Sequence, residues 1–351
     1  MTKLISSYQC PSNIALVKYW GKKAKGIQLP ANASISFTLS DLHATTTVEA
    51  MPCDETLTEP AFMFQLNDLP QPSFEPKIKS FLKRIWENYT FLQNHRLFIK
   101  SSNNFPHGAG IASSAAGFGA LSLCMVDLQN QFCGTALNNP SREASRISRL
   151  GSGSACRSMF AEPGVWGKTY KVDDSCDEYA VPMKELHDSF NTWKDIVLIV
   201  DANEKAVSST EGHKQLENNV YAESRHESAK MSMDKMVDAL KKHNLPAFIH
   251  TVESEALQLH AMMMVSPMHY LLMEPNTLAI IKKIWDFREK TMLPLCFTLD
   301  AGSNVHLLYD GKEEDKIKNF VENELLPYCS QNRYFCSDLG GKPQKLSTFE
   351  Q

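Results

Sequence analysis

Hydrophobic and polar positions in the first third of the chain predict both strands and a helix. Residues 33–39 and 44–49 are predicted strands, because apolar and β-branched positions there are bounded by Pro, Asn and Asp. Residues 76–89 carry apolar side chains at spacings of three and four, which is typical of an amphipathic helix. These side chains are Ile78, Phe81, Leu82 and Ile85. A further strand is predicted over residues 96–100.

The rest of the chain continues this mixture with longer helices. Helices are predicted over residues 115–132, 141–150, 220–241, 245–264 and 277–291, the last with Asn276 as its N-cap. Strands are predicted over residues 195–201, 293–299 and 305–309. This order favours an α+β fold over a doubly wound sheet. Because residues 174–193 are polar and lack periodicity, we expect two domains, residues 1–190 and residues 191–351.

Composition and charge exclude several classes of protein. The 351 residues are 43% hydrophobic and 22% charged, with a formal net charge of -4, which is ordinary globular usage. No basic field is present to hold nucleic acid or anionic lipid, and no run of about 18 apolar residues could span a membrane. Nine cysteines without C-x-x-C pairing or zinc-like spacing favour reduced thiols and a cytoplasmic location.

Residues 106–114 form a loop of glycines and small residues between a predicted strand and a predicted helix. Backbone N–H groups of such a loop and of a helix N-terminus can surround phosphate oxygens. The loop lacks the Gly-Lys-Ser/Thr ending of a Walker A motif and the spacing of a dinucleotide fold. A tight strand-to-helix connection without any ligand remains an alternative.

A second small-residue loop, residues 151–157, presents the hydroxyls of Ser152 and Ser154 and the guanidinium of Arg157. Arginine offers a planar fork to a carboxylate or phosphate, so this loop is a candidate for a second anion. A solvated turn between helices is the alternative. Lys18 and Lys22 follow an apolar run near the N-terminus, and they are either anion-binding groups or ordinary surface charges.

Asp300 closes the predicted strand 293–299 and precedes a Gly-containing turn. Its carboxylate is either a turn cap or a base that orients a substrate hydroxyl. Ser208 and Ser209 form a hydroxyl cluster, which would serve equally well as the N-cap of a following helix.

Five segments together resemble the diphosphomevalonate decarboxylase family of the GHMP small-molecule kinase superfamily. They are S-N-I-A-L-V-K-Y-W-G-K (12–22), G-A-G-I-A-S-S-A-A-G-F (108–118), G-S-G-S-A-C-R-S (151–158), V-S-S-T-E-G (207–212) and T-L-D-A-G (298–302). They occur in the family's order and span almost the whole chain. The resemblance therefore does not depend on a single loop.

The resemblance implies a GHMP kinase fold with the active site in a cleft between two domains. The N-terminal domain would be like ribosomal protein S5 domain 2, and the C-terminal domain would be a ferredoxin-like α+β domain. The implied reaction is the decarboxylation of mevalonate 5-diphosphate, with ATP and Mg²⁺, to isopentenyl diphosphate, CO2, ADP and phosphate. ATP would phosphorylate the tertiary 3-hydroxyl. Departure of the resulting phosphate would then drive loss of the neighbouring carboxylate as CO2. No electron-sink cofactor is expected, and a homodimer is implied.

The resemblance also implies roles for individual residues. Asp300 would orient or deprotonate the 3-hydroxyl, Lys18 would lie beside it, and Arg157 would pair with the substrate's carboxylate or diphosphate. Further substrate contacts are expected from Tyr19, Lys22, Ser152, Ser154, Ser208 and Ser209. ATP contacts are expected from Ser102, Asn104, Gly108, Gly110, Ala112, Ser113 and Ser114. No side chain is predicted as a metal ligand, because Mg²⁺ would bridge the ATP phosphates.

Two positions depart from the family pattern: His107 stands where many members have Thr, and Ser303 stands where Pro commonly occurs. Neither removes a group with an expected role. Three alternatives remain: a related enzyme that acts on mevalonate or its 5-phosphate, a non-catalytic ligand-binding relative, and a nucleic-acid binder. Lys18, Lys22 and Arg157 favour the diphosphate, the intact Asp300 disfavours a non-catalytic relative, and the acidic net charge disfavours nucleic acid.

Overall fold

The computed structural model describes residues 2–23, 28–106, 110–202, 212 and 219–347. Its first sheet contains eight described strands, with β12-β1-β2-β5-β3-β4 in spatial order and β6 and β7 branching from β2. All neighbours are antiparallel except β3 and β5. The strands are β1 (Leu4–Val17), β2 (Ser34–Pro52), β3 (Phe62–Leu66), β4 (Leu69–Pro70), β5 (His95–Asn103), β6 (Gly164–Trp166), β7 (Ala180–Pro182) and β12 (Gln344–Lys345).

Strand β2 is continuous where the sequence predicts two separate strands, over residues 33–39 and 44–49. Its pairing with β1 shifts register opposite residues 40–42, because Ser12 faces Leu39 while Pro11 faces His43. The polar residues at this point therefore form a bulge and not a chain-reversing turn. The bulge is held from outside the sheet, since the Asp41 carboxylate accepts a hydrogen bond from the Asp338 N–H at 2.8 Å.

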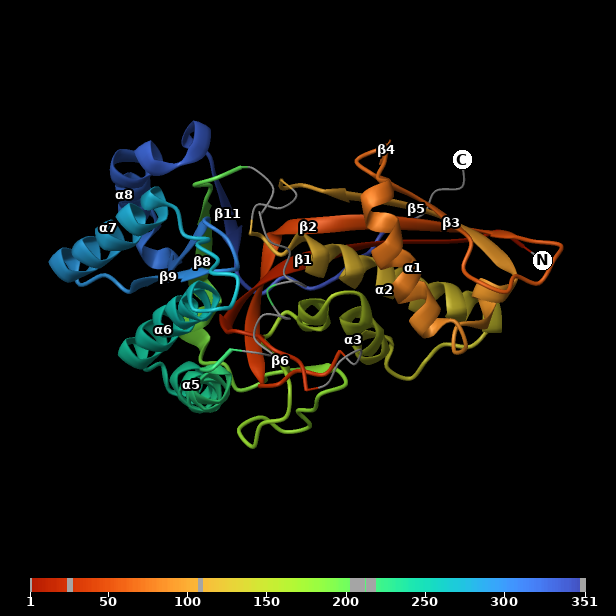
Figure 1. Cartoon of the computed structure of the whole chain (residues 1–351), viewed down its shortest axis with the longest axis horizontal. Helices are drawn as coiled ribbons and strands as arrows, with labels where there is room; N and C mark the ends of the chain where they lie inside the picture. The colour runs from red at the N-terminus through yellow and green to blue at the C-terminus, as the bar shows by residue number, and fades with distance from the viewer. Residues whose placement is uncertain (1, 24–27, 107–109, 203–211, 213–218, 348–351) are drawn as a thin grey trace.

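Within the described residues, three α-helices accompany this sheet: α1 (Glu75–Ile85), α2 (Ser113–Cys133) and α3 (Pro140–Gly151) (Figure 1). Helix α2 packs against β1 and β2 through small residues. A Cβ at Gly119 would lie 2.5 Å from the Cys10 Sγ, so glycine is required for this close approach. The contact fixes α2, and with it the α2 N-terminus, against the centre of the sheet.

The second sheet has the spatial order β11-β8-β10-β9, with every neighbouring pair antiparallel. Its strands are β8 (Trp193–Leu198), β9 (Leu295–Leu299), β10 (Val305–Asp310) and β11 (Tyr334–Asp338). The helices α5 (Ala222–Lys242), α6 (Leu245–Met264) and α7 (Pro275–Thr291) lie between β8 and β9, and α8 (Glu314–Phe320) follows β10. Numbered along the chain, the strand order is 4-1-3-2, which confirms the expected ferredoxin-like arrangement.

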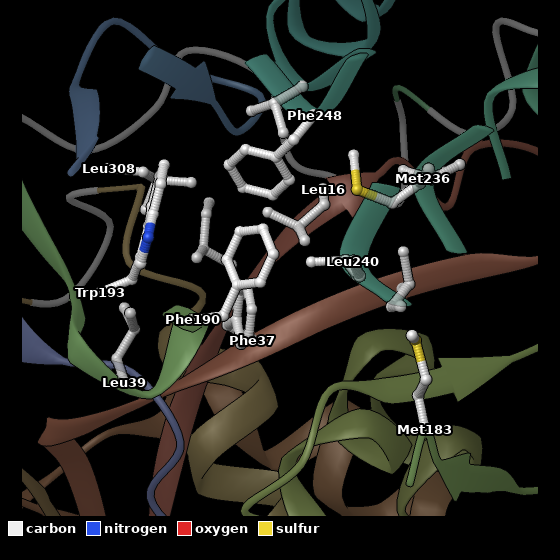
Figure 2. Close-up of a cluster of buried hydrophobic side chains, with 14 of the residues drawn as sticks. Leu16, Phe37, Leu39, Met183, Phe190, Trp193, Met236, Leu240, Phe248 and Leu308 are labelled. Atoms are coloured by element: carbon white, nitrogen blue, oxygen red, sulfur yellow. The ribbon is translucent and has the colours of Figure 1, made fainter. Parts of the chain in front are cut away.

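One hydrophobic core continues from the first sheet into the second (Figure 2). Leu16 on β1 and Phe37 on β2 belong to the same buried cluster as Trp193 on β8 and Phe248 on α6. The rings of Trp193 and Phe248 meet edge to face, with their centroids 5.0 Å apart. Because side chains from both sheets are buried together, the ends of β1 and β9 are held in a fixed relation.

The boundaries of several elements differ from the sequence predictions. Helix α1 ends at Ile85 and β8 ends at Leu198, both earlier than predicted. The predicted N-cap of α7 is wrong: Glu274 caps the helix in a reciprocal capping box with Thr277. Asn276 lies inside the first turn, and its amide donates to the Tyr328 carbonyl at 3.1 Å. None of the helices in the described part of the chain has the length and apolar character needed to cross a bilayer.

Candidate active site

Lys18 follows the end of β1 and is buried although it carries a charge, with 2% of its surface exposed. Its Nζ donates to the Ala15 carbonyl at 2.7 Å and to the Thr298 hydroxyl at 2.8 Å. The same Nζ lies 3.9 Å from the Asp300 Oδ1. Thr298 and Asp300 lie at the end of β9, so this ammonium joins the two sheets.

The charge state of Lys18 depends on its surroundings. Burial lowers the pKa of Lys18 to about 8, against the opposing effect of the carboxylates of Asp300 and Glu255, while Arg157 and Arg225 lower it further. At neutral pH the side chain is therefore still largely an ammonium, close to the pH at which it loses its proton.

The backbone of Lys18 is held on both sides. Its N–H donates to a Glu255 carboxylate oxygen at 2.9 Å, and its carbonyl accepts from the Asn32 amide at 2.9 Å. Glu255 on α6 is fully buried and forms a salt bridge of 2.7 Å with Arg225 on α5. Helices of the second half of the chain therefore position a residue of the first half.

Asp300 stands at the C-terminal end of β9 and is partly open to solvent, with 26% of its side chain exposed. Its backbone carbonyl is hydrogen-bonded by the His260 Nε2 at 3.0 Å. The carboxylate thus has a buried ammonium on one side and an accessible face on the other. The accessible face leaves the carboxylate within reach of a bound hydroxyl, as a general base must be.

Arg157 is the second buried cation of the site. It lies in the short helical segment Gly153–Met159 and is 2% exposed. Its Nε donates to the Ser36 hydroxyl at 2.5 Å, and its Nη1 donates to the Ser34 hydroxyl at 2.8 Å. Burial lowers the pKa of Arg157, and nearby Asp300 opposes that effect. Both serines are on β2, so the sheet fixes the direction of the guanidinium.

The two small-residue loops meet at their serines. The Ser114 hydroxyl at the start of α2 lies 3.1 Å from the Ser152 hydroxyl. Beside them the Tyr19 and Trp166 rings lie 4.6 Å apart, and a Cβ at Gly153 would come within 2.6 Å of the Tyr19 ring. Gly153 is therefore needed for Tyr19 to occupy its place.

The described part of the first loop has the backbone that an anion-binding turn requires. Gly110 has a φ of +78° and Ala112 has a φ of +46°, after which α2 begins at Ser113. The Ile111 carbonyl accepts a hydrogen bond from the Ser12 hydroxyl of β1. The positive end of the α2 dipole favours an anion at this end.

A shallow pocket lies beside this helix terminus, with a cavity volume of about 70 Å³, or about 540 Å³ when the open solvent in front of it is included. It is mainly apolar, and α1, α2, β3 and β5 contribute to it. The Lys77 Nζ lies at its edge, 5.1 Å from the centre of the Phe118 ring. Although much of the Lys77 side chain is exposed, desolvation and the charge of Lys22 lower its pKa. Lys22 is therefore near enough to Lys77 for the two charges to interact.

Two family models divide the chain between them. The diphosphomevalonate decarboxylase-like N-terminal domain matches residues 10–177, and the mevalonate 5-diphosphate decarboxylase C-terminal domain matches residues 195–348. The chain belongs to the diphosphomevalonate decarboxylase family. The family expected from the sequence motifs is thereby confirmed.

Relatives within the family match over nearly the whole chain. The diphosphomevalonate decarboxylase of Candida albicans is 30% identical, over 97% of this chain and 98% of its own length. A solved mevalonate diphosphate decarboxylase from Enterococcus faecalis is 26% identical with a TM-score of 0.83, over 99% of this chain and 100% of that one. A solved structure of MDDEF in complex with MVAPP, AMPPCP and magnesium has the same identity and coverage, with a TM-score of 0.84. The expected GHMP kinase fold is confirmed.

The residues expected from the family motifs fall into several groups in the structure. Those that the structure places around Lys18, Asp300 and the two loops are Lys18, Tyr19, Gly110, Ala112, Ser113, Ser114, Ser152, Arg157 and Asp300. Lys22 lies near Lys77, and Ser154 lies on the second loop, where its carbonyl accepts from the Asn13 amide. Gly108, Ser208 and Ser209, with the departure at His107, lie outside the described residues. Ser102 is exposed on β5, while the Asn104 amide donates to the Asp41 carbonyl at 2.6 Å and accepts from the His43 N–H. The Asn104 amide thus holds the β2 bulge, and it is the neighbouring Asn103 that lines the pocket.

Several residues around the site were not among the sequence predictions. They are Glu255 and Arg225 behind Lys18, Lys77 beside the pocket, and the Ser34–Ser36 pair that holds Arg157. One signal could have found Glu255, because it interrupts the apolar face of a helix that is otherwise buried. Lys77 and Arg225 give no such signal, since charged residues are ordinary in amphipathic helices.

Proposed function

We propose that this chain catalyses the ATP-dependent decarboxylation of mevalonate 5-diphosphate to isopentenyl diphosphate, CO2, ADP and phosphate. One observation carries the proposal. A partly exposed carboxylate, Asp300, lies beside the buried ammonium of Lys18 and near enough to the buried guanidinium of Arg157 for the two charges to interact. Phosphoryl transfer needs positioning and charge stabilisation more than it needs a covalent nucleophile. Membership of the family and the MVAPP complex of MDDEF support this choice.

In this proposal Asp300 orients the substrate's 3-hydroxyl and accepts its proton. Its exposed face is available to a bound hydroxyl, and the Lys18 ammonium lies 3.9 Å from its Oδ1. Lys18 is itself held by the Ala15 carbonyl and the Thr298 hydroxyl, so its charge is pre-positioned. Such pre-organisation removes the need for solvent to reorganise during the transfer.

Arg157 binds the substrate's carboxylate or diphosphate. Two serine hydroxyls already hold its Nε and Nη1, and no side chain in the described ranges forms a salt bridge with it. A buried guanidinium in such surroundings favours an anionic ligand. We assign the diphosphate end to Tyr19, Lys22, Ser152 and Ser154, together with Ser208 and Ser209.

ATP occupies the other side of the site. The α2 N-terminus with Gly110, Ala112, Ser113 and Ser114 binds its phosphates, as does Gly108 in the preceding part of the loop. We place the adenine in the apolar pocket beside α2, where Asn103 and Lys77 add polar contacts. Ser102 and Asn104 then contribute through the position of β5 and the β2 bulge, not through direct contact.

Mg²⁺ accompanies the nucleotide. In the described part of the chain no three His, Cys, Asp or Glu side chains gather into a site that could bind a metal ion. The donors that fit Mg²⁺ are the hydroxyls of Ser113 and Ser114 at the α2 terminus, which are hard oxygen ligands, together with the phosphates and water. When bound, the ion offsets the charge of the phosphates.

Loss of CO2 follows from the substrate's own chemistry once the 3-oxygen has become a phosphate. Departure of that phosphate leaves an electron-deficient carbon that accepts the C–C bond electrons of the neighbouring carboxylate. The protein's part is to hold the carboxylate and the leaving group in place. Arg157 and Lys18 supply the fixed positive charge for this step.

We further propose two domains that meet near residue 190, a homodimer, and a cytoplasmic location. The two sheets and the gap between the two matched family regions support the boundary. Exposed apolar side chains such as Met268 and Leu271 support self-association, and nine unpaired cysteines support a reducing compartment. Light scattering of the purified protein tests the dimer.

The deciding experiment is an ADP-release assay with mevalonate, its 5-phosphate and its 5-diphosphate in parallel, with CO2 and the isoprenoid product quantified. ADP and CO2 formed together from the diphosphate alone would support the proposal. ADP without CO2 would identify a 3-kinase, and preference for the monophosphate would identify a different decarboxylase. No turnover with any of the three would favour a ligand-binding protein.

A further inference from the structure

A buried histidine and aspartate lie behind the phosphate loop, outside the groups assigned above. His306 on β10 is 1% exposed, and Asp195 on the neighbouring strand β8 is fully buried. The His306 Nδ1 lies 2.6 Å from the Asp195 Oδ2. On its other side, the His306 Nε2 lies 3.4 Å from the Gly110 carbonyl oxygen. This imidazole therefore connects the second sheet with the loop that we assign to ATP.

The partners of the ring define its protonation. A carboxylate oxygen faces one nitrogen and a backbone carbonyl oxygen faces the other, and both are acceptors. With Asp195 ionised, both contacts are hydrogen bonds only if both ring nitrogens carry protons. Burial lowers the pKa of His306, but the charge of Asp195 and the hydrogen bond to its carboxylate outweigh that effect. The pKa of His306 is therefore raised above its ordinary value. Asp300 also raises this pKa and Lys18 lowers it, so the ring shares the electrostatic surroundings of the site.

We propose that His306, held as an imidazolium by Asp195, is a positioning residue that fixes the Gly110 peptide of the phosphate loop. The proposal rests on the assignment of this loop to ATP. In a trans peptide the carbonyl of one residue and the N–H of the next point in opposite directions. Fixing the Gly110 carbonyl on His306 therefore directs the Ile111 N–H to the opposite side.

A second contact from the same strand region supports this role. A Cβ at Gly110 would lie 3.7 Å from the Asn304 Cβ, so the loop rests on the residue just before β10. The Asn304 amide in turn accepts from the Asp201 N–H at 2.9 Å and donates to the Asp201 carbonyl at 3.0 Å. The support beneath Gly110 is therefore built from the ends of two strands, and His306 adds a charge-assisted bond to it.

The ionisation of His306 can be measured directly. In protein labelled with ¹⁵N-histidine, the signal that disappears in His306→Gln belongs to this ring. We expect that signal to show two protonated nitrogens at pH 7 in the wild type, and one protonated nitrogen in Asp195→Asn. A neutral tautomer in the wild type would overturn the proposal.

The positioning role is tested by separating the two substrates. In Asp195→Asn and His306→Gln we expect a rise of about tenfold in both KM and calorimetric Kd for Mg²⁺·ATP, as loss of a charge-assisted bond implies. The KM for mevalonate 5-diphosphate should stay within about twofold. Tyr309→Phe on the same strand is the control, because the buried Tyr309 hydroxyl has no hydrogen-bond partner within the described residues and should leave both constants unchanged.

Each other outcome overturns the proposal. Equal changes for both substrates, or a loss of folding in both variants with a neutral ring in the wild type, would indicate a purely structural pair. Unchanged nucleotide affinity would show that the loop does not depend on His306. If the wild type binds ATP but releases no CO2, the decarboxylase assignment fails while the nucleotide data still decide the role of His306.

Discussion

The Lys18 Nζ lies 3.9 Å from the Asp300 Oδ1, and the two residues come from strands near opposite ends of the chain. Lys18 follows β1 in the first sheet, and Asp300 follows β9 in the second. The shared hydrophobic core holds these strand ends together. The chemistry of the site therefore depends on how the two sheets pack.

Asp300→Asn should reduce turnover by about 10²–10⁴-fold, because an amide cannot accept the proton of the 3-hydroxyl. The amide has nearly the same shape, so both substrates should still bind with Kd values within about threefold of the wild type. ADP release and calorimetry measure the two effects. Asp286→Asn, on the exposed face of α7, is the control and should be fully active. Near-normal turnover in Asp300→Asn would remove Asp300 from its assigned role.

The pH dependence of the reaction should report Lys18. Because burial lowers the pKa of Lys18 to about 8, the ammonium is lost as the pH rises through that value. We expect kcat/KM to fall on the alkaline side with an apparent pKa near 8. In the pH profile of kcat, the alkaline fall should occur at a higher pH, because the phosphates of bound substrates favour the ammonium form of Lys18.

Lys18→Arg provides the matched test, since a guanidinium stays charged throughout this range. The variant should be slower because its planar head does not fit the Ala15 and Thr298 acceptors, but its alkaline limb should disappear. An unchanged circular dichroism spectrum across this pH range excludes unfolding as the cause. An unchanged limb in Lys18→Arg would assign it to another group.

Much of this arrangement could be predicted from local sequence patterns, and some of it could not. Asp300 was a candidate because it ends an apolar strand beside a Gly turn. The phosphate loop was a candidate because small residues precede a long helix. The meeting of Lys18 with Asp300 depends on packing between distant segments, which no local pattern contains. Likewise, Asp41 suggested a break in β2, because a bulge held by Asp338 has the same polar signal as a turn.

Arg157→Gln should weaken mevalonate 5-diphosphate binding by about 10–100-fold, the effect of losing a charged hydrogen-bonding group. The KM for ATP should change little. Ser34→Ala, which removes the partner of Nη1 but keeps the charge, should give a smaller effect in the same direction. Steady-state kinetics with each substrate varied in turn separates the two constants. An effect of Arg157→Gln on the ATP constant alone would show that the second loop has been misassigned.

The pocket beside α2 gives a prediction with an internal control. Gly117 lines the pocket, and a Cβ there would have no heavy atom within 4 Å. Gly117→Ala should therefore raise the free energy of unfolding by up to about 1 kcal/mol through helix propensity, without change in the KM for ATP. Gly117→Leu should fill the pocket and raise that KM about tenfold or more while the protein remains folded. Equal ATP constants for the two variants would place the adenine elsewhere.

The buried pair of Glu255 and Arg225 should control both stability and the charge of Lys18. Glu255→Gln leaves the Arg225 guanidinium buried without its counter-charge, so the free energy of unfolding should fall by about 3–5 kcal/mol. The Gln oxygen can still accept from the Lys18 N–H. Because the Glu255 carboxylate raises the pKa of Lys18, its loss should move the alkaline limb of kcat/KM below 8.

The double variant Glu255→Gln, Arg225→Met separates these two effects. Removing both charges should restore most of the lost stability, since a neutral buried pair carries no uncompensated charge. It also removes the cation that lowers the pKa of Lys18, so the limb should return toward its wild-type position. Urea unfolding and pH–rate profiles of the three proteins measure both quantities. The free energy of unfolding could recover in the double variant while the alkaline fall of kcat/KM stays at the same pH in both variants. Glu255 would then stabilise the fold only, and Asp300 would be the carboxylate that maintains the charge of Lys18.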